Sequence, residues 1–337
     1  MKQSNPKQFK KADTPKRPSP EEILADKEQN ALVSYWRWYR EKKRLKKENK
    51  KKPETFGEIV WSWTKTLVGA IIVVMIINGL LIASFVVPTG SMENTVMTGD
   101  FLFVNKFVYG PSTPQVIPFL NIPLPYLRFP GVKEPEKGDV IVFIYPGGLN
   151  ELKPKEFQYY LKRCVGVGGD TLQVVNGVLY VNSQIFPDPE FINYEPAALG
   201  TENNPTFPRH IHGWTANNYG PLVIPKTGDT IKLTVENLAG WDIFIQREGH
   251  KIEENLGKIL IDGKEANFYV VERDYVFGMG DHRNHSEDSR SWGFIPVENV
   301  VGTPLMVYWS WNPDISFFDF FNKMASVRWS RIGTLID

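Results

Sequence analysis

Two side chains in this sequence, Ser91 and Lys162, could form a nucleophile and its base. Ser91 follows Gly90, which lets the backbone approach a substrate closely. Thr89 places a second hydroxyl nearby, which could help the Ser91 N–H bind an oxyanion. A serine hydroxyl is a weak nucleophile until a base removes its proton. Without such a base, Ser91 is an ordinary turn residue, and that interpretation stays open at this point.

Histidine is the usual base for a serine, but no triad pattern is present. The Gly-x-Ser-x-Gly turn typical of many serine hydrolases does not occur around Ser91. The histidines are His210, His212, His250, His282 and His285. His210 and His212 could suggest a metal pair, but no third ligand follows at a recognisable spacing. The sequence therefore indicates neither a metal site nor a cofactor.

A lysine can serve as the base if burial keeps it neutral, because the charged form loses its hydration. Lys162 lies in the run Tyr159–Val165, whose alternation predicts a β-strand. Tyr160 and Cys164 would share its face, so its neighbours there are weakly polar or apolar. Periodicity alone also fits an exposed strand lysine.

A third segment, residues 278–293, is dense in glycines, acids, arginines and small hydroxyls. This composition is typical of a rigid, hydrogen-bonded loop. A solvated surface turn has a similar composition, so both interpretations stay open here.

A membrane anchor is predicted before Ser91. Residues 67–87 contain no charge, and their only clearly polar side chains are Asn78 and Ser84. As a helix they would span roughly 30 Å, the thickness of the hydrocarbon core of a bilayer. A buried core helix would carry a polar face, and a cleavable signal peptide is shorter and lies at the extreme N-terminus. With Trp61 and Trp63 at the interface, we expect a single anchor over residues 61–87.

The charge distribution predicts the orientation of this anchor. Residues 1–60 carry 17 Lys and Arg against 9 Asp and Glu, whereas residues 88–94 carry no positive charge. The positive-inside rule then places the N-terminus in the cytoplasm and everything after residue 87 on the exported side.

The remaining sequence predicts a mainly β exported part. Short alternating runs are separated by Gly, Pro and Asn, and Asn176–Gly177 is a strong hairpin signal. The lone cysteine, Cys164, rules out an intramolecular disulfide, so a hydrophobic core must hold this part together. The expected strands include Phe101–Val104, Asp139–Phe143, Tyr159–Val165, Thr171–Val175, Val178–Val181, Thr230–Val235, Trp241–Gln246 and Tyr275–Phe277.

This organisation gives six expected regions. A basic cytoplasmic head over 1–60, with a charged helix from about 19 to 52, precedes the anchor at 61–87. A first part of an antiparallel β catalytic core (88–182) and an inserted β-rich subdomain (183–272) follow. The second part of the core (273–312) and an aromatic C-terminal tail (313–337) complete the chain. The tail could touch the outer leaflet of the membrane or pack in the core.

Taken together, these segments resemble the type I signal peptidase (leader peptidase) family. The family segment PSGSMxPT is read here as Pro88–Thr95, and Y-[IV]-K-R-x-[IV]-G-x-x-G-D as Tyr160–Asp170. The segment G-D-N-R-x-x-S-x-D-S-R is read as Gly280–Arg290, and a Gly-Asp strand as Lys137–Phe143. The segments occur in the family's order behind an anchor, over roughly 60–182 and 273–304.

The resemblance implies a role for each matching residue. Ser91 would attack the scissile carbonyl and neutral Lys162 would accept its proton, while the Ser91 N–H and the Thr89 hydroxyl would hold the oxyanion. Ser286 would orient Lys162. The ion pairs bracing the site would come from Asp281, Arg283, Asp288 and Arg290. Pockets for small substrate side chains at positions −1 and −3 would be lined by Val87, Met92, Tyr160 and Leu161.

Three departures from the family pattern concern the surroundings of the catalytic dyad, Ser91 and Lys162. Asn94 replaces the usual proline after the nucleophile, His282 replaces an asparagine, and Asn284–His285 replaces a more typical Asp-Asn pair.

The resemblance implies a membrane-bound enzyme of the bacterial cytoplasmic membrane that cuts exported preproteins after a small-x-small site. The expected partners are preproteins and the lipid bilayer, with no nucleic acid, and the oligomeric state is open. A self-cleaving Ser/Lys protease of the repressor type would share the dyad, but such proteins are cytosolic. A catalytically inactive, membrane-tethered binding protein is a third possibility, since sequence alone does not show that Ser91 and Lys162 meet.

Overall fold

The computed structural model describes residues 31–48, 55–112, 116–117, 122–123, 127–154, 157–194, 205–209 and 213–336. The chain divides into two compact units, residues 1–71 and 72–337. The first unit contains helix α2 (Ala31–Glu48) and the beginning of helix α3 (Phe56–Leu80). The predicted charged helix therefore exists over 31–48, and its remaining residues lie outside the described part of the chain.

Helix α3 is long and apolar enough, by length and composition, to cross a membrane. Its bounds differ from those predicted. The helix ends at Leu80, and Ile82–Val86 form strand β1, so the last part of the expected anchor is not helical. The apolar run continues past the helix because β1 is also apolar and pairs antiparallel with β2, from Ile82 opposite Asn105 to Val86 opposite Phe101. Hydrophobicity without periodicity does not show where a helix becomes a strand.

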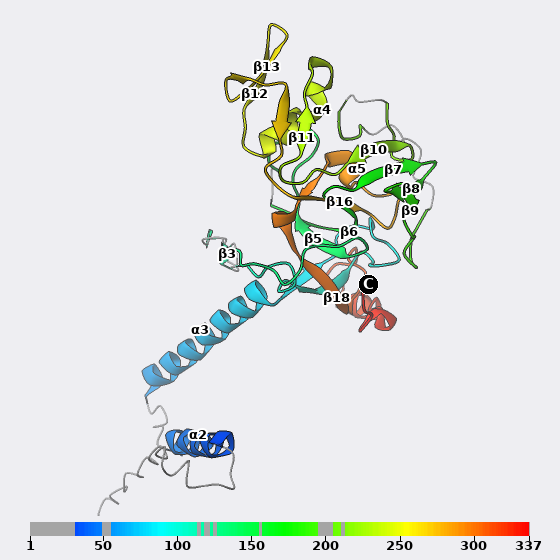
Figure 1. Cartoon of the computed structure of the whole chain (residues 1–337). Coiled ribbons are helices and arrows are strands. Elements are labelled where there is room, and N and C mark those ends of the chain that lie inside the picture. Colours follow the sequence, from blue (N-terminus) through cyan, green and yellow to red (C-terminus); the bar gives the residue numbers. More distant parts are fainter. Residues whose placement is uncertain are drawn as a thin grey trace, which may run out of the picture. The chain divides into compact units, whose positions relative to one another are not determined.

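A seven-stranded sheet forms the main body of the second unit (Figure 1). Its strands lie in the order β1-β2-β18-β5-β6-β16-β17, and all neighbours are antiparallel. After β1, their bounds are β2 Asp100–Asn105, β5 Val140–Ile144, β6 Tyr159–Val167, β16 Tyr275–Met279, β17 Ile295–Pro296 and β18 Val300–Ser310. Strands from both predicted core segments therefore alternate within one sheet, and residues 183–272 contribute none to it.

A four-stranded sheet in the order β10-β7-β8-β9 contains the predicted hairpin. Asn176 and Gly177 both have positive φ, 49° and 84°, as a two-residue turn of this type requires. The bounds are β7 Thr171–Val175, β8 Val178–Val181, β9 Gln184–Ile185 and β10 Tyr219–Val223. The hairpin prediction is confirmed. The expected domain boundary at residue 183 falls between strands of this sheet, and the boundaries stay predictions.

One expected strand is a helix instead. Trp241–Gln246 lie within α4 (Val235–Arg247), which begins at a capping box in which Thr234 and Asn237 exchange side chain-to-backbone hydrogen bonds. The apolar residues of this short run alternate as in a strand, and this pattern predicted a strand although the capping box starts a helix. The smaller sheets pair β11 (Thr230–Lys232) with β15 (Phe268–Val270), and β3 (Val116–Ile117) with β4 (Ile122–Pro123). In the three-stranded sheet, β13 (Lys258–Ile261) lies between β12 (Ile252–Asn255) and β14 (Lys264–Glu265).

Short helical segments complete the described fold. They are α5 (Ser289–Trp292), η2 (Val297–Asn299), α6 (Phe320–Ala325) and η3 (Trp329–Arg331). The prediction of a mainly antiparallel β structure, with one apolar helix near the N-terminus, is confirmed.

Candidate active site

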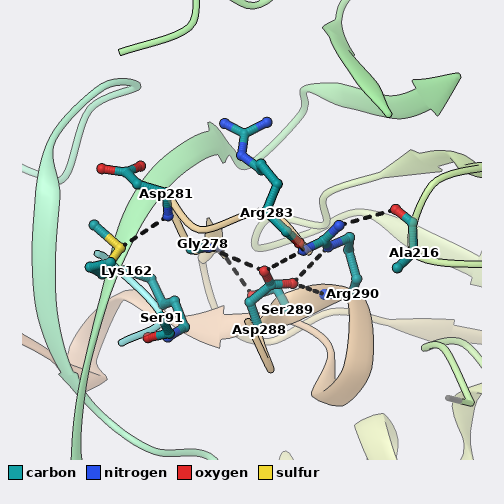
Figure 2. A network of polar contacts seen from close by, with 11 residues as sticks. Ser91, Lys162, Ala216, Gly278, Asp281, Arg283, Asp288, Ser289 and Arg290 are labelled. Carbon is teal, nitrogen blue, oxygen red and sulfur yellow. Dashed lines mark hydrogen bonds and ion pairs between the residues drawn. The ribbon is translucent and has the colours of Figure 1, made fainter. Parts of the chain in front are cut away.

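The structure brings Ser91 and Lys162 together although 71 residues separate them in sequence. Ser91 lies in the turn that follows β1, and Lys162 lies in β6 opposite Ile141 of β5. The Lys162 Nζ donates to Ser91 Oγ over 2.6 Å, a short and well-formed hydrogen bond. The close-up of the site shows the two side chains meeting (Figure 2). The alternative of an exposed strand lysine is therefore wrong.

Burial sets the electrostatics of Lys162, which is 3% exposed. The loss of hydration lowers the pKa of Lys162 from 10.5 to about 8, because the ammonium form is disfavoured in the interior. The carboxylates of Asp288, Glu287 and Asp281 act in the opposite direction, and the charge of Arg290 adds to the lowering. Lys162 is therefore partly neutral at mildly alkaline pH.

Thr89 and Ser286 are placed differently with respect to the dyad. The Thr89 hydroxyl lies 3.5 Å from Ser91 Oγ, at the limit of a hydrogen bond. The Ser286 Oγ is buried and makes no hydrogen bond within the described part of the chain, so its expected bond to Lys162 is not formed here. A Cβ on Gly280 would lie 2.2 Å from Ser286 Oγ and 2.5 Å from Ser91 O. Only glycine at position 280 lets these two segments approach so closely.

A buried ion pair joins the two halves of the site. Both oxygens of Asp281 accept from Arg163, at 2.9 Å from Nε and 2.8 Å from Nη2. The Asp281 carboxylate also accepts from the Thr95 hydroxyl over 2.6 Å. Because Arg163 follows Lys162 and Thr95 belongs to the turn of Ser91, this pair fixes base and nucleophile relative to each other.

Arg163, and not Arg283, is therefore the partner of Asp281. Arg163 was not among the residues predicted to brace the site. A basic residue at a buried strand position requires a carboxylate partner, and that requirement was the available signal. The Arg283 guanidinium is buried and has no hydrogen-bond partner among the described residues, and burial lowers its pKa. In Figure 2 it points away from the Asp288–Arg290 pair.

A second buried ion pair joins Asp288 and Arg290, two of the residues predicted to brace the site. Arg290 donates to Asp288 through Nε over 2.9 Å and through Nη2 over 2.8 Å. The Asp288 carboxylate also accepts from the Gly280 N–H over 3.1 Å, and the neighbouring Ser289 hydroxyl accepts from the Gly278 N–H over 3.0 Å. These contacts hold β16 and the loop after it behind Lys162 (Figure 2).

A cleft with a volume of about 620 Å³ opens over Ser91 and Lys162. All four residues predicted to line substrate pockets lie in its wall: Val87, Met92, Tyr160 and Leu161. Its wall also contains His285 and Glu287, which the sequence did not single out as lining residues. The cleft is therefore apolar along its strands and carries a charged group at Glu287.

The described residues contain no group of three or more potential ligands that could hold a metal ion. His210 and His212 lie outside the described part of the chain. The chemistry that this arrangement supports is acyl transfer by a serine, with a partly neutral amine in contact with its hydroxyl.

Comparison with known proteins assigns the family. The model of the family described as "Signal peptidase, peptidase S26" matches residues 60–309. Signal peptidase I of Helicobacter pylori strain J99 is 31% identical over 297 residues, covering 82% of this chain and 93% of the relative. Signal peptidase I of Pseudomonas aeruginosa is 27% identical over 283 residues, covering 80% of this chain and 78% of the relative. A crystal structure of a signal peptidase I from Enterococcus faecalis is 18% identical and covers 51% of this chain and 98% of its own, with a TM-score of 0.24.

The chain belongs to the signal peptidase family, and the predicted resemblance is confirmed. Membership supports a serine peptidase activity on signal peptides.

Proposed function

We propose that this chain is a membrane-bound signal peptidase that uses Ser91 as nucleophile and neutral Lys162 as general base. The observation that carries this proposal is the 2.6 Å contact between Lys162 Nζ and Ser91 Oγ at a buried lysine with a lowered pKa. Lys162 takes the hydroxyl proton while Ser91 Oγ attacks the scissile carbonyl carbon. The resulting ammonium then gives its proton to the leaving amine, and an ester joins the signal peptide to Ser91.

The same lysine serves the second half of the reaction. Neutral again after the amine leaves, Lys162 takes a proton from the water that attacks the ester. The bond between the carbonyl carbon and Ser91 Oγ then breaks, the signal peptide leaves with its new carboxyl group, and the Lys162 ammonium returns the proton to Ser91 Oγ. The negative charge that forms on the carbonyl oxygen in both halves is held by the Ser91 N–H and the Thr89 hydroxyl. Ser286, whose hydroxyl lies against Gly280, is the group that orients Lys162 once substrate fills the cleft.

The substrate segment adds to free strand edges. Residues 160–162 of β6 pair with β5 on one side, whereas β16 pairs with β6 only from Arg163 onward. Strand β1 pairs with β2 alone in the described sheet. The cleft lies between these two edges, which supports binding of an extended peptide by main-chain hydrogen bonds. Small residues at positions −1 and −3 would fit the apolar wall of Val87, Met92, Tyr160 and Leu161.

The preprotein and the enzyme meet at the bilayer. Helix α3 anchors the chain once in a bacterial cytoplasmic membrane, with the basic head in the cytoplasm and the catalytic part on the exported side. The C-terminal tail adds a lipid contact, because Phe317, Phe318, Phe320 and Phe321 are exposed and not packed in the core. A cleft held close to the membrane surface suits a substrate whose signal peptide is itself in the bilayer.

The test is cleavage of a purified preprotein by the full chain in detergent micelles. Wild type is expected to release a mature protein whose N-terminus follows a small-x-small site, as read by mass spectrometry. Ser91→Ala and Lys162→Ala should each lose nearly all activity while keeping the circular dichroism spectrum of wild type. Cleavage by both variants at the wild-type rate would refute the dyad, and an inactive wild type on several preproteins would refute the function.

A further inference from the structure

The turn that carries Ser91 has a backbone that excludes proline at its fourth residue. The Glu93 N–H donates to Gly90 O over 3.0 Å, and the Val96 N–H donates to Met92 O over 2.9 Å. Between these two bonds Asn94 has a φ of 77°, in the left-handed region that asparagine tolerates. Proline, with φ held near −65°, cannot adopt this conformation. The backbone of this turn is therefore not restrained by a proline ring at position 94.

His282, a second departure from the family pattern, touches this turn with both its main chain and its side chain. Its N–H donates to Ser91 O over 3.1 Å. Its ring Nδ1 lies 3.4 Å from Oε2 of Glu93. The His282 residue is 7% exposed, and its Nδ1 is buried without a hydrogen bond in the described part of the chain. Since a buried ring nitrogen needs a polar partner, the Glu93 carboxylate is the group placed to supply one.

The Glu93 side chain folds back across the turn. A Cβ built on Gly90 would lie 3.4 Å from Oε2 of Glu93, so the carboxylate rests over Gly90. The same oxygen faces the His282 ring, as described above. The carboxylate thus lies between Gly90, the residue before Ser91, and His282 in the loop 281–285.

We propose that Glu93 and His282 form a positioning pair that holds the Ser91 turn in place. The inference rests on the proposed function, because what the pair positions is the nucleophile. Contact between the carboxylate and the ring keeps Ser91 Oγ in line with Lys162 and keeps the Ser91 N–H directed at the oxyanion. Both act through the turn, so their loss slows the chemical step and leaves substrate binding nearly unchanged.

A double-mutant cycle tests whether the two side chains act as a pair. Glu93→Gln, His282→Leu and the double variant are made in the full chain, and kcat and KM are measured on a preprotein in detergent. Each single variant should lower kcat by roughly 10-fold with KM changed less than twofold, and the double variant should be no worse than the poorer single variant. A double loss equal to the product of the single losses, or single variants with unchanged kcat, would overturn the proposal.

Two further variants separate positioning from simple packing. His282→Gln keeps a donor that can reach the carboxylate, so it should retain more activity than His282→Leu, whereas equal activities would mean that the ring only fills space. His250→Leu is the matched control, because His250 also contacts carboxylates, Asp262 at 2.7 Å and Glu272 at 3.0 Å, but in the segment between α4 and β16. Its kcat should equal that of wild type, and a comparable loss there would assign the effect to general destabilisation.

The turn itself supplies an independent test. Asn94→Pro restores the residue usual in the family, yet it should lower kcat, because proline cannot take a φ of 77°. Asn94→Gly should keep wild-type kcat. Full activity of Asn94→Pro would overturn the proposal. The double-mutant cycle is interpreted only when wild type cleaves the preprotein and Ser91→Ala does not. A failure of the proposed function is thereby distinguished from a failure of the positioning pair.

Discussion

Two buried lysines, Lys162 in β6 and Lys323 in α6, have different surroundings. Lys162 is 3% exposed and donates a hydrogen bond to the Ser91 hydroxyl. Lys323, in α6, is 4% exposed and donates to the carbonyls of Asn312 and Ile315 over 2.7 and 2.8 Å. It also lies over the ring of Trp311, 4.9 Å from the centroid.

The difference shows that burial alone does not make a lysine a base. Carbonyl oxygens accept from an ammonium and replace the water that burial removes, so Lys323 works as a clamp for the loop 312–315. The hydroxyl beside Lys162 replaces much less of that hydration, and the pKa of Lys162 falls to about 8. The number and kind of acceptors around the nitrogen therefore distinguish Lys323 from Lys162.

The largest expected effect is the loss of activity when Lys162 is replaced. Lys162→Met keeps the length and burial of the side chain but removes the base, so kcat/KM should fall by roughly 10³-fold. Cleavage of a preprotein in detergent measures this loss. Lys323→Met, assayed in parallel, should stay within twofold of wild type, and equal losses in both variants would contradict the distinction drawn between the two lysines.

The same two variants should change stability in opposite directions. The lowered pKa means that the folded protein binds the Lys162 proton more weakly than the unfolded chain, so folding is penalised at every pH below about 8 and the penalty disappears above about 10.5. Lys162→Met should therefore stabilise the fold by up to about 3 kcal/mol at pH 7. Urea unfolding followed by circular dichroism measures the change, and a destabilised Lys162→Met would show that the lysine is well solvated in the folded state.

Lys323→Met should instead destabilise. It leaves buried carbonyls of the loop 312–315 without a donor, at a cost of about 2 kcal/mol. The same unfolding experiment measures this loss, with Lys153, an exposed lysine, changed to Met as the control. An unchanged midpoint for Lys323→Met would mean that water satisfies these carbonyls and that the lysine does not hold the loop.

The smallest expected effect is a change in the pKa of Lys162 when the nearby charge of Glu287 is removed. Glu287 lies in the cleft wall, and its charge raises the pKa of Lys162. Glu287→Gln should therefore lower that pKa, and the acid limb of the kcat/KM profile should move to lower pH by a few tenths of a unit, since exposed charges are strongly screened. A shift to higher pH would contradict the sign of this interaction.

Much of the fold followed from local sequence. The Asn176–Gly177 turn defined its hairpin because positive φ at both residues is a local requirement that few residues meet. The end of α3 was not predictable in the same way. One uninterrupted apolar run covers both the helix and β1, and the change at Leu81 depends on pairing with β2, which is distant in sequence. Helix α4 was missed because its capping box is a weaker signal than an apolar run.

The site residues also differ in how far they could be predicted, because some belong to local motifs and others meet only through tertiary packing. Ser91, Lys162, Asp288 and Arg290 were each singled out from their motifs. The structure joins Ser91 to Lys162 and Asp288 to Arg290. The partner of Asp281 did not follow, because alternation within a strand says which face a residue occupies and not which loop packs against it. The contact of His282 with Glu93 joins residues 189 positions apart, and only the packing of the 281–285 loop on the Ser91 turn creates it.

The pH dependence of kcat/KM tests the central claim, that neutral Lys162 is the base, most directly. The measurement uses wild type on a preprotein from pH 6 to pH 10, with unfolding followed over the same range to confirm that the protein stays folded. The rate should rise about tenfold per pH unit on the acid side and level off near pH 8, where burial places the pKa of Lys162. A rate that is flat from pH 6 to pH 8 would remove Lys162 from the role of base.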